Sequence, residues 1–387
     1  MSVELSPSQL IHPDFWSGKV YLNTAAEGLP LQVCADAVGR YLNAKATGEP
    51  GREAFWKEYE KTRQLAGRLF GLSGEQTALV SSTTEALNTI AQGIDWRPGD
   101  EVVFTSIEFP SNMFPWVALQ QRGVKTRVVH PRDGRIRLED LLDQITPRTR
   151  LVTVSQVSYA TGQHLDPRPL WERVSGTPTL LCVDATQAAG RVPVDGNLAD
   201  FTVASTFKWM NSIHGSAILT VSRRALTGDV AASIQGPSGW LSTENCFSAD
   251  RLERFQPRRD AQRFQYGMPN FDSVYSLAAA LELQTPERIQ ARRQQLAPLV
   301  ARLGSRLREL GLTVLVPVES EDQAGIVPFA CRDSARLRQQ LRERNVFVQG
   351  DDGRIRAAIH WYNTAEQIDQ YLSEIQRCLA ASPESFR

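Results

Sequence analysis

Short apolar segments alternate with amphipathic stretches between residues 77 and 222. Seven segments rich in β-branched and apolar residues are predicted strands: TALVSS (77–82), EVVFTS (101–106), VKTRVVH (124–130), RLVTVS (150–155), TLLCVD (179–184), FTVAS (201–205) and SAILTVS (216–222). Residues 84–94, 111–123 and 138–145 have helical patterns. This alternation predicts an α/β fold with a mostly parallel sheet, and the continuous apolar strands indicate burial of both faces.

The pattern changes near residue 275. One long helical stretch (273–310) precedes a mixture of strands and helices, with strands at 313–318, 325–330, 345–349 and 353–360 and helices at 333–343 and 364–380. This mixture predicts a second, smaller α+β domain. We therefore expect an N-terminal segment (1–30), a large domain (31–272) and a small C-terminal domain (273–387). Residues 236–262 form the longest irregular stretch, and such loops are often functional.

Composition narrows the class of protein. The 43 basic residues balance the 43 acidic residues, so bulk charge predicts no nucleic-acid or membrane-surface partner. No apolar run is long enough to cross a membrane, and the first residues do not read as a signal peptide. The five cysteines and five histidines are scattered without metal-ligand spacing. We expect reduced thiols, a cytoplasmic protein and no metal site.

A single lysine raises the first chemical question. Lys208 lies in VASTFKWMNSIHG (203–215) among apolar and small residues, and it is the only lysine after Lys125. Its stem could cover apolar neighbours while the amine reaches water. Alternatively, its amine could be held in a pocket for covalent chemistry.

Residues that directly follow the predicted strands are informative because ligands of open parallel sheets bind beyond the carboxyl ends of the strands. Thr83 and Thr84 open a helix after the first strand, where hydroxyl and backbone N–H groups can bind an anion or simply cap the helix. Phe109 is a ring that could pack in the core or stack on a ligand. Asp184 ends an apolar strand and could cap the next helix or hold a positive charge.

Four successive strand ends thus offer hydroxyl groups, a ring, an acid and, with Ser205 and Lys208, a hydroxyl and an amine. Pyridoxal phosphate requires this combination. A phosphate cradle fixes its tail, a ring covers one face, an acid keeps the pyridine nitrogen protonated, and a lysine forms the Schiff base. The set together predicts this cofactor more strongly than any member alone.

The same segments carry a family resemblance over nearly the whole chain. The chain resembles the class V aminotransferase group of fold-type I pyridoxal-phosphate enzymes, which includes cysteine desulfurases, isopenicillin N epimerase and kynureninase. The motifs, in the family's order, are YLNTAAEGLP (21–30), STTEALNTIA (82–91), EFPSNMFPW (108–116), VDATQAAGRVPVD (183–195), STFKW (205–209), RFQYGMPNF (263–271) and RAAIHWYNT (356–364).

The resemblance assigns cofactor-binding roles by motif. It implies that Thr83 and Thr84 bind the phosphate with help from Ser205. Asp184 would pair with the pyridine nitrogen and Gln187 would reach the ring's phenolic oxygen. Further cofactor contacts are expected from the stacked ring of Phe109 and from Lys208, the catalytic residue that forms the Schiff base.

The resemblance also implies how the substrate is bound. Arg356 occupies the place of the family's substrate-carboxylate arginine, and a guanidinium matches a carboxylate with two parallel hydrogen bonds. The alternative for Arg356 is a structural ion pair with Asp351 or Asp352. Asn23 would line the substrate pocket, because the family's N-terminal segment enters the active site. A homodimer with shared active sites is implied as well.

Several departures from the family's motifs bear on the reaction and on the phosphate site. Phe109 and Pro110 stand where desulfurases have histidines, as in the kynureninase arrangement, and Phe207 replaces the histidine before the lysine. Residues 345–356 contain no cysteine where the desulfurase nucleophile should lie. Met268 replaces the threonine of the loop that reaches the neighbouring subunit's phosphate site. We therefore do not expect a persulfide-forming desulfurase.

The predicted function is an enzyme that acts at Cα or Cβ of an α-amino acid, of lyase type (C–S cleavage or β-elimination) or epimerase type. An aminotransferase is the alternative within the family. A non-catalytic protein that retains the fold is the alternative of another class. His214 could relay protons near the cofactor or could be structural.

Overall fold

A computed structural model describes residues 6–315, 323–381 and 386. Its centre is a seven-stranded sheet of order β2-β8-β7-β6-β5-β3-β4, in which β8 alone runs antiparallel to its neighbours. The strands are β2 (Thr77–Val80), β3 (Glu101–Thr105), β4 (Lys125–Val129), β5 (Thr149–Ser155), β6 (Leu180–Asp184), β7 (Phe201–Ser205) and β8 (Ala217–Val221). All seven predicted strands are present, so the mostly parallel α/β fold is confirmed.

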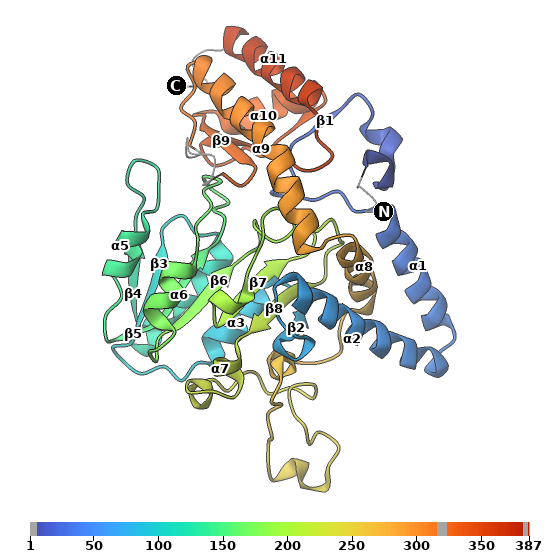
Figure 1. The fold of residues 1–387 in the computed structure, drawn as a ribbon, viewed down its shortest axis with the longest axis vertical. Helices are drawn as coiled ribbons and strands as arrows, with labels where there is room; N and C mark the ends of the chain where they lie inside the picture. The colour runs from blue at the N-terminus through green and yellow to red at the C-terminus, as the bar shows by residue number, and fades with distance from the viewer. Residues whose placement is uncertain (1–5, 316–322, 382–385, 387) are drawn as a thin grey trace.

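Helices cover both faces of this sheet (Figure 1). They are α1 (Gln32–Ala46), α2 (Arg52–Leu69), α3 (Thr83–Gly93), α4 (Phe114–Ala118), α5 (Leu138–Asp143), α6 (Arg168–Val174), α7 (Arg223–Leu226) and α8 (Phe271–Glu282). Five of the seven strands are buried at every position, and the edge strand β4 is the most exposed. This burial explains their unbroken apolar sequences, because each strand packs against helices on both sides.

Two of the predicted helical stretches are interrupted. The stretch at 111–123 is a short helix, α4, between two 3-10 turns, and it ends at Gly123, whose φ of 79° is left-handed. The stretch at 273–310 is two helices, α8 and α9 (Pro286–Glu309). The break falls where Thr285 caps α9 and Pro286 opens it, a typical helix start that the long apolar pattern concealed.

The C-terminal part combines helices with short strands: α9, β9 (Ile326–Ala330), α10 (Ser334–Glu343), β10 (Val346–Phe347), β11 (Arg354–Ala358) and α11 (Ala365–Ala381). β11 pairs antiparallel with β9, and β10 pairs in parallel with β1 (Val20–Tyr21) of the N-terminal segment. The strand predicted at 313–318 lies partly outside the described residues. Of the part described, Val314 forms an isolated bridge with Phe329.

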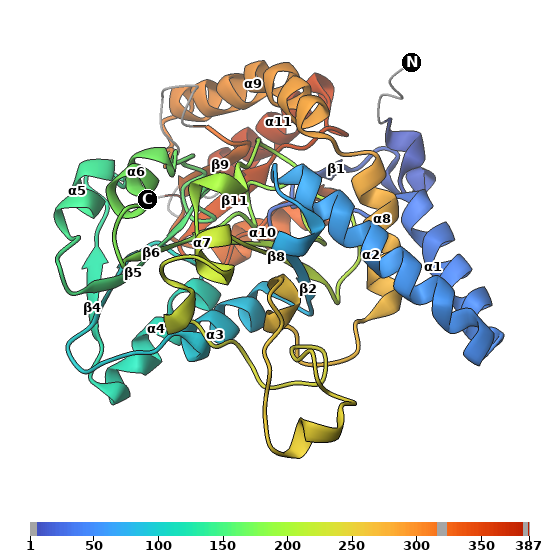
Figure 2. The same cartoon turned by 60° about the horizontal axis from the view of Figure 1, so that its bottom comes forward.

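The domain boundaries at residues 30 and 272 stay a prediction. Side-chain packing shows how the N-terminal segment, the sheet part and the C-terminal part contact one another. Helix α8 lies side by side with α1 and α2 in both views (Figures 1 and 2), and the rings of Tyr41, Phe55 and Phe271 cluster between them. Val20 and Leu22 are fully buried in the C-terminal core. The N-terminal segment therefore joins the two parts of the molecule.

The irregular stretch at 236–262 projects from the body, where it forms the yellow arm of Figures 1 and 2. Phe247 and Leu252 on this arm are almost fully exposed. Among the described residues, no helix has both the length and the apolar character required to cross a membrane.

Candidate active site

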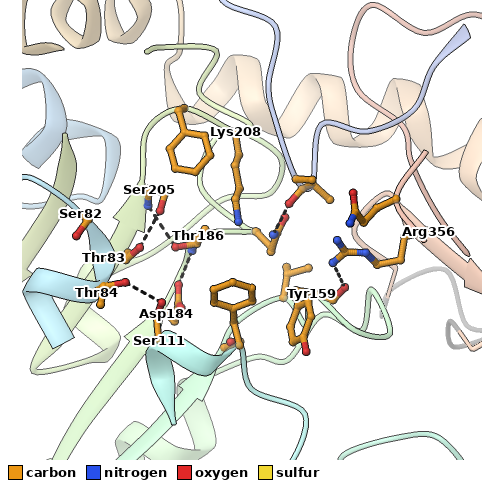
Figure 3. Close-up of a pocket in the computed structure, with 18 residues that line it drawn as sticks. Ser82, Thr83, Thr84, Ser111, Tyr159, Asp184, Thr186, Ser205, Lys208 and Arg356 are labelled. Carbon is orange, nitrogen blue, oxygen red and sulfur yellow. Dashed lines mark hydrogen bonds between the residues drawn. The ribbon is translucent and has the colours of Figure 1, made fainter. Parts of the chain in front are cut away.

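A cavity of about 370 Å³ opens at the carboxyl ends of the parallel strands (Figure 3). It is lined by side chains from seven separate segments of the chain, which include all the strand ends singled out in the sequence. The lining residues are Ala25, Ala26, Ser82, Thr83, Thr84, Phe109, Ser111, Ser155, Val157, Tyr159, Asp184, Thr186, Gln187, Ser205, Phe207, Lys208, Gln349 and Arg356.

One end of the cavity is the N-terminus of α3. Ser82 caps this helix by accepting a hydrogen bond from the Glu85 backbone N–H at 3.1 Å. The hydroxyl oxygens of Thr83 and Ser205 lie 2.8 Å apart, which ties the helix to the end of β7. The positive end of a helix and several hydroxyl groups thus converge on one spot, which suits a phosphate group.

Lys208 points into the middle of the cavity (Figure 3). Burial, with a smaller contribution from Arg356, lowers the pKa of its amine to about 8, against the opposing effects of Asp184 and Glu27. The loop that carries Lys208 is held by the N-terminal segment, because the Gly28 N–H donates to the Phe207 carbonyl at 3.0 Å. A Cβ atom at Gly28 would lie 2.0 Å from the Lys208 carbonyl oxygen, so only glycine allows this approach.

Asp184 is buried at the end of β6 beside this lysine. Its carboxylate accepts a hydrogen bond from the Thr186 backbone N–H at 2.8 Å. Burial raises the pKa of the Asp184 carboxyl, and the hydrogen bonds from Thr186 and the charge of Lys208 oppose that rise. A buried acid of this kind is stabilised when a positive charge binds next to it.

Phe109 and Tyr159 form an aromatic wall of the cavity. Their ring centroids are 5.2 Å apart at an interplanar angle of 90°, and the Lys208 amine is 5.5 Å from the Phe109 centroid. Phe109, which precedes the 3-10 turn after the buried strand β3, is 44% exposed. The ring faces the cavity rather than the core, so a flat ligand could stack on it.

Arg356 closes the end of the cavity opposite α3 (Figure 3). Its Nη1 donates to the Tyr159 carbonyl at 2.8 Å, and burial lowers its pKa. The two neighbouring acids pair elsewhere, Asp351 with Arg338 at 2.9 Å and Asp352 with Arg354 at 2.7 Å. Within the described part of the chain, no carboxylate forms a salt bridge with Arg356, which leaves its guanidinium available for a ligand.

Two predicted site residues are placed differently from the rest. Gln187 lines the cavity, but its amide donates to the Ala25 carbonyl at 2.8 Å and accepts from the Trp209 indole at 2.6 Å. Asn23 is not among the lining residues, and its backbone forms a bridge with Ala358 instead. The N-terminal segment reaches the cavity two residues later, at Ala25. A substrate-binding role for Asn23 therefore stays a prediction.

His214 and Met268 lie outside the cavity. His214 stacks on Phe207 at 4.0 Å and its Nε2 is 3.3 Å from the Glu27 carboxylate. Met268 is exposed and lines a second cavity of about 210 Å³, whose wall also contains Ser81 and Glu85 at the start of α3.

Several residues that line the cavity were not predicted from the sequence. Thr186 lines the cavity, and its hydroxyl oxygen accepts from the Ser205 N–H at 3.2 Å. Its place in the DATQ motif could have revealed it. No motif in the sequence pointed to Tyr159, Ser155 or Gln349. Ser155 N–H donates at 3.0 Å to Glu108, a buried carboxyl that burial keeps at a raised pKa.

These groups fit the pyridoxal phosphate that the sequence predicts. The hydroxyl-rich start of α3 suits its phosphate, and the exposed face of Phe109 suits its ring. Asp184 and Lys208 are a buried acid and a buried amine in the same cavity, as a protonated pyridine and a Schiff base require.

The fold and this site define a known class of protein. The model of the aminotransferase class-V family matches residues 20–371, so the chain belongs to that family, and the predicted resemblance is confirmed. The chain is 30% identical over 326 residues to the uncharacterized aminotransferase YcbU of Bacillus subtilis, across 83% of this chain and 85% of YcbU. It is 26% identical to a probable cysteine desulfurase of Pyrococcus abyssi, across 92% of each chain.

Solved structures agree with the fold. The apo cysteine desulfurase of Thermococcus onnurineus superposes with a TM-score of 0.85 at 23% identity, across 97% of each chain. The cystine C–S lyase C-DES, solved with its product cysteine persulfide, superposes with a TM-score of 0.81 at 23% identity, across 94% of this chain and 98% of that one.

Proposed function

We propose that this protein is a pyridoxal-phosphate lyase that cleaves a C–S bond, or eliminates another group, at Cβ of an α-amino acid. The observation that carries the proposal is the single cavity in which Lys208, Asp184 and Arg356 meet. The names of its relatives, cysteine desulfurases and a cystine C–S lyase, support a lyase. A protein that kept this fold without chemistry would gain nothing from a buried lysine, because burying an amine costs free energy.

Each side chain has a defined task in this proposal. When bound, the cofactor supplies a carbonyl carbon that links covalently to amines and a ring that accepts electrons from Cα. Thr83, Thr84 and Ser205 bind the phosphate. Asp184 holds the proton on the pyridine nitrogen. Lys208 takes the proton from Cα and returns it. Its pKa of about 8 is close to neutral pH, so the amine can both accept and donate a proton.

Substrate recognition follows from the other end of the cavity. Arg356 binds the α-carboxylate with two hydrogen bonds and so orients the bond that breaks. Phe109 and Tyr159 cover the reacting centre and exclude water from it. Gln349 also lines the cavity, and in this proposal it contacts the substrate's side chain.

Replacement of Asp184 by asparagine is expected to slow proton exchange at Cα by about 10²–10⁴-fold. The amide carries no charge to keep the pyridine nitrogen protonated, whereas the phosphate cradle still binds the cofactor. Exchange of the Cα proton for deuterium, followed by NMR, measures this rate. If the variant exchanges at the wild-type rate, Asp184 only caps the turn at Thr186.

No protein-bound persulfide is expected to accumulate when the enzyme turns over L-cysteine or L-cystine. None of the cavity-lining residues is a cysteine, and four of the five cysteines are buried elsewhere. The sulfur product would therefore leave the site directly. Intact-protein mass spectrometry after turnover detects an added sulfur atom, and a persulfide mapped to Cys246 or Cys331 would contradict this prediction.

The reaction type is tested with a panel of L- and D-amino acids, by following the cofactor's absorbance and identifying products by mass. A lyase gives an α-keto acid together with ammonia and the released side-chain group. An aminotransferase is the second candidate, favoured by the name of YcbU, and it would need an added α-keto acid to turn over. An epimerase would invert Cα without losing any group.

We also propose a homodimer in the cytoplasm. The loop at Met268 is exposed beside the start of α3, where a second subunit could complete the phosphate site. All five cysteines lie in the described part of the chain and none is in a disulfide, which fits a reducing compartment.

A further inference from the structure

Glu108 is a buried carboxyl group that the proposed mechanism does not use. It lies between β3 and the 3-10 turn Pro110–Asn112 and is only 2% exposed. Its two oxygens accept four hydrogen bonds: from the Thr105 hydroxyl at 2.9 Å, from the Asn112 amide at 2.9 Å, from the Ser155 N–H at 3.0 Å and from the Ser155 hydroxyl. Glu108 therefore joins the end of β3 to the end of β5 through four uncharged donors.

The hydrogen bonds of Asn112 fix which side of its amide faces Glu108. Its Oδ1 accepts from the Thr153 hydroxyl at 2.7 Å and from the Trp116 indole at 3.2 Å. Because an indole N–H can only donate, the oxygen of Asn112 must face Trp116 and its NH2 group must face Glu108. A carboxyl group meets this requirement, since both of its oxygens can accept, whereas a glutamine offers one acceptor and one donor.

Two neighbours of Glu108 line the candidate active site. Ser155 lines the cavity and lies opposite Asp184 in the parallel pairing of β5 with β6. Phe109, which also lines the cavity, lies within the turn that the bond between Glu108 and Asn112 closes, and its carbonyl accepts from the Asn112 N–H at 2.8 Å. Glu108 itself is not a lining residue, so it acts on a bound ligand through these neighbours.

A second buried glutamate, at the other end of β3, provides a comparison. Glu101 is 4% exposed and accepts from Arg127 Nε at 2.6 Å and from the Thr146 hydroxyl at 2.6 Å. Neither Glu101 nor these two partners line the cavity. The two glutamates share a strand and a buried position, but only the network of Glu108 leads to cavity-lining side chains.

We propose that Glu108 is a positioning residue, which fixes the Ser155 hydroxyl and the Phe109 ring for the bound cofactor. This rests on the proposed function, because both groups would act on pyridoxal phosphate. The Phe109 ring covers the cofactor's face, and the Ser155 hydroxyl keeps the surroundings of Asp184 constant. Rigid placement matters because a small displacement at a reacting centre lowers the rate strongly.

Replacement of Glu108 by glutamine tests the proposal with almost no change in side-chain size. The new NH2 group would face the NH2 group of Asn112, so the hydrogen-bond network could not close. The variant should fold and bind the cofactor, but its kcat should fall by at least about tenfold with little change in KM. The circular dichroism band of the bound cofactor should change as well, because that band reports how the ring is placed against its surroundings.

Two further variants assign the effect. Glu101→Gln is the matched control, and it should lower the unfolding temperature while kcat and the circular dichroism band stay at the wild-type values. Ser155→Ala removes the hydroxyl and leaves the carboxyl group in place, and it should also change the band. The losses of kcat in the double variant should be less than additive, because Glu108 acts in part through Ser155.

A Glu108→Gln variant with the wild-type kcat and band would overturn the proposal, and so would one that only unfolds at a lower temperature, as Glu101→Gln does. If Glu108→Gln does not fold, Ser155→Ala carries the test, and an unchanged band would then overturn the proposal. Failure of the proposed function is distinguishable, because borohydride would then fail to attach the cofactor to Lys208 in the wild type.

Discussion

Replacement of Lys208 by alanine is expected to give a folded protein that holds pyridoxal phosphate without a covalent link and turns over at least about a thousandfold more slowly. The amine is both the attachment point of the cofactor and the base at Cα in the proposed mechanism. The fold should survive, because the loop around Lys208 is held by backbone bonds such as Gly28 N–H to the Phe207 carbonyl.

Borohydride reduction followed by peptide mass spectrometry measures the covalent link. In the wild type, the reduced cofactor should be found on the peptide that contains Lys208, and Lys125→Ala on the exposed end of β4 should behave like the wild type. The attachment rate should rise as pH passes about 8 and then level off, because the neutral amine reacts and burial has lowered its pKa to about 8. A label on another lysine would refute the proposed function.

Replacement of Arg356 by alanine is expected to weaken binding of an α-amino acid by roughly thirty- to several-thousand-fold. This range corresponds to about 2–5 kcal/mol for the loss of a buried charge-assisted contact. The guanidinium already donates to the Tyr159 carbonyl and has no carboxylate partner in the described structure, so the substrate's carboxylate is the group that it lacks. Titration of the cofactor's absorbance with substrate measures the change.

Two comparisons separate recognition of the carboxylate from support of the fold. An amine without a carboxylate should bind Arg356→Ala almost as well as the wild type, and Arg356→Lys should recover only part of the loss because an ammonium lacks the planar fork. Arg354→Ala is the matched control, since Arg354 lies over the same Tyr159 ring but pairs with Asp352. If Arg356→Ala weakened the binding of the amino acid and of the plain amine equally, Arg356 would support the fold and would not bind the carboxylate.

Much of the fold was predictable because its strands are buried on both faces and carry unbroken apolar sequences. The prediction of one helix over 273–310 was wrong. The helical pattern of apolar residues continues across the helix start at Thr285 and Pro286, so the break could not be seen in it. That break matters because it sends α8 to the sheet side, against α1 and α2, and α9 to the C-terminal part. Local pattern cannot distinguish one long helix from two with different packing partners.

The site was predictable where a residue type is costly at its position. Lys208 and Asp184 stand out in apolar surroundings, and the structure brings both to one cavity. Tyr159 and Gln349 are ordinary loop residues in sequence, and they line the cavity only because the loop after β5 lies beside the segment between β10 and β11. The hydrogen-bond partners of Gln187 were likewise hidden, since Ala25 and Trp209 are distant from it along the chain.

The sequence by itself determined the seven strands, the family and the four strand-end groups that require a cofactor, because each is encoded in a short run of residues. Only the tertiary structure decided which of those groups face one cavity, and that Asp351 and Asp352 pair with Arg338 and Arg354 rather than with Arg356. The physical reason is that charge pairing and desolvation depend on neighbours from separate segments. A sequence shows which residues are charged, and the fold decides which charges are left without a partner.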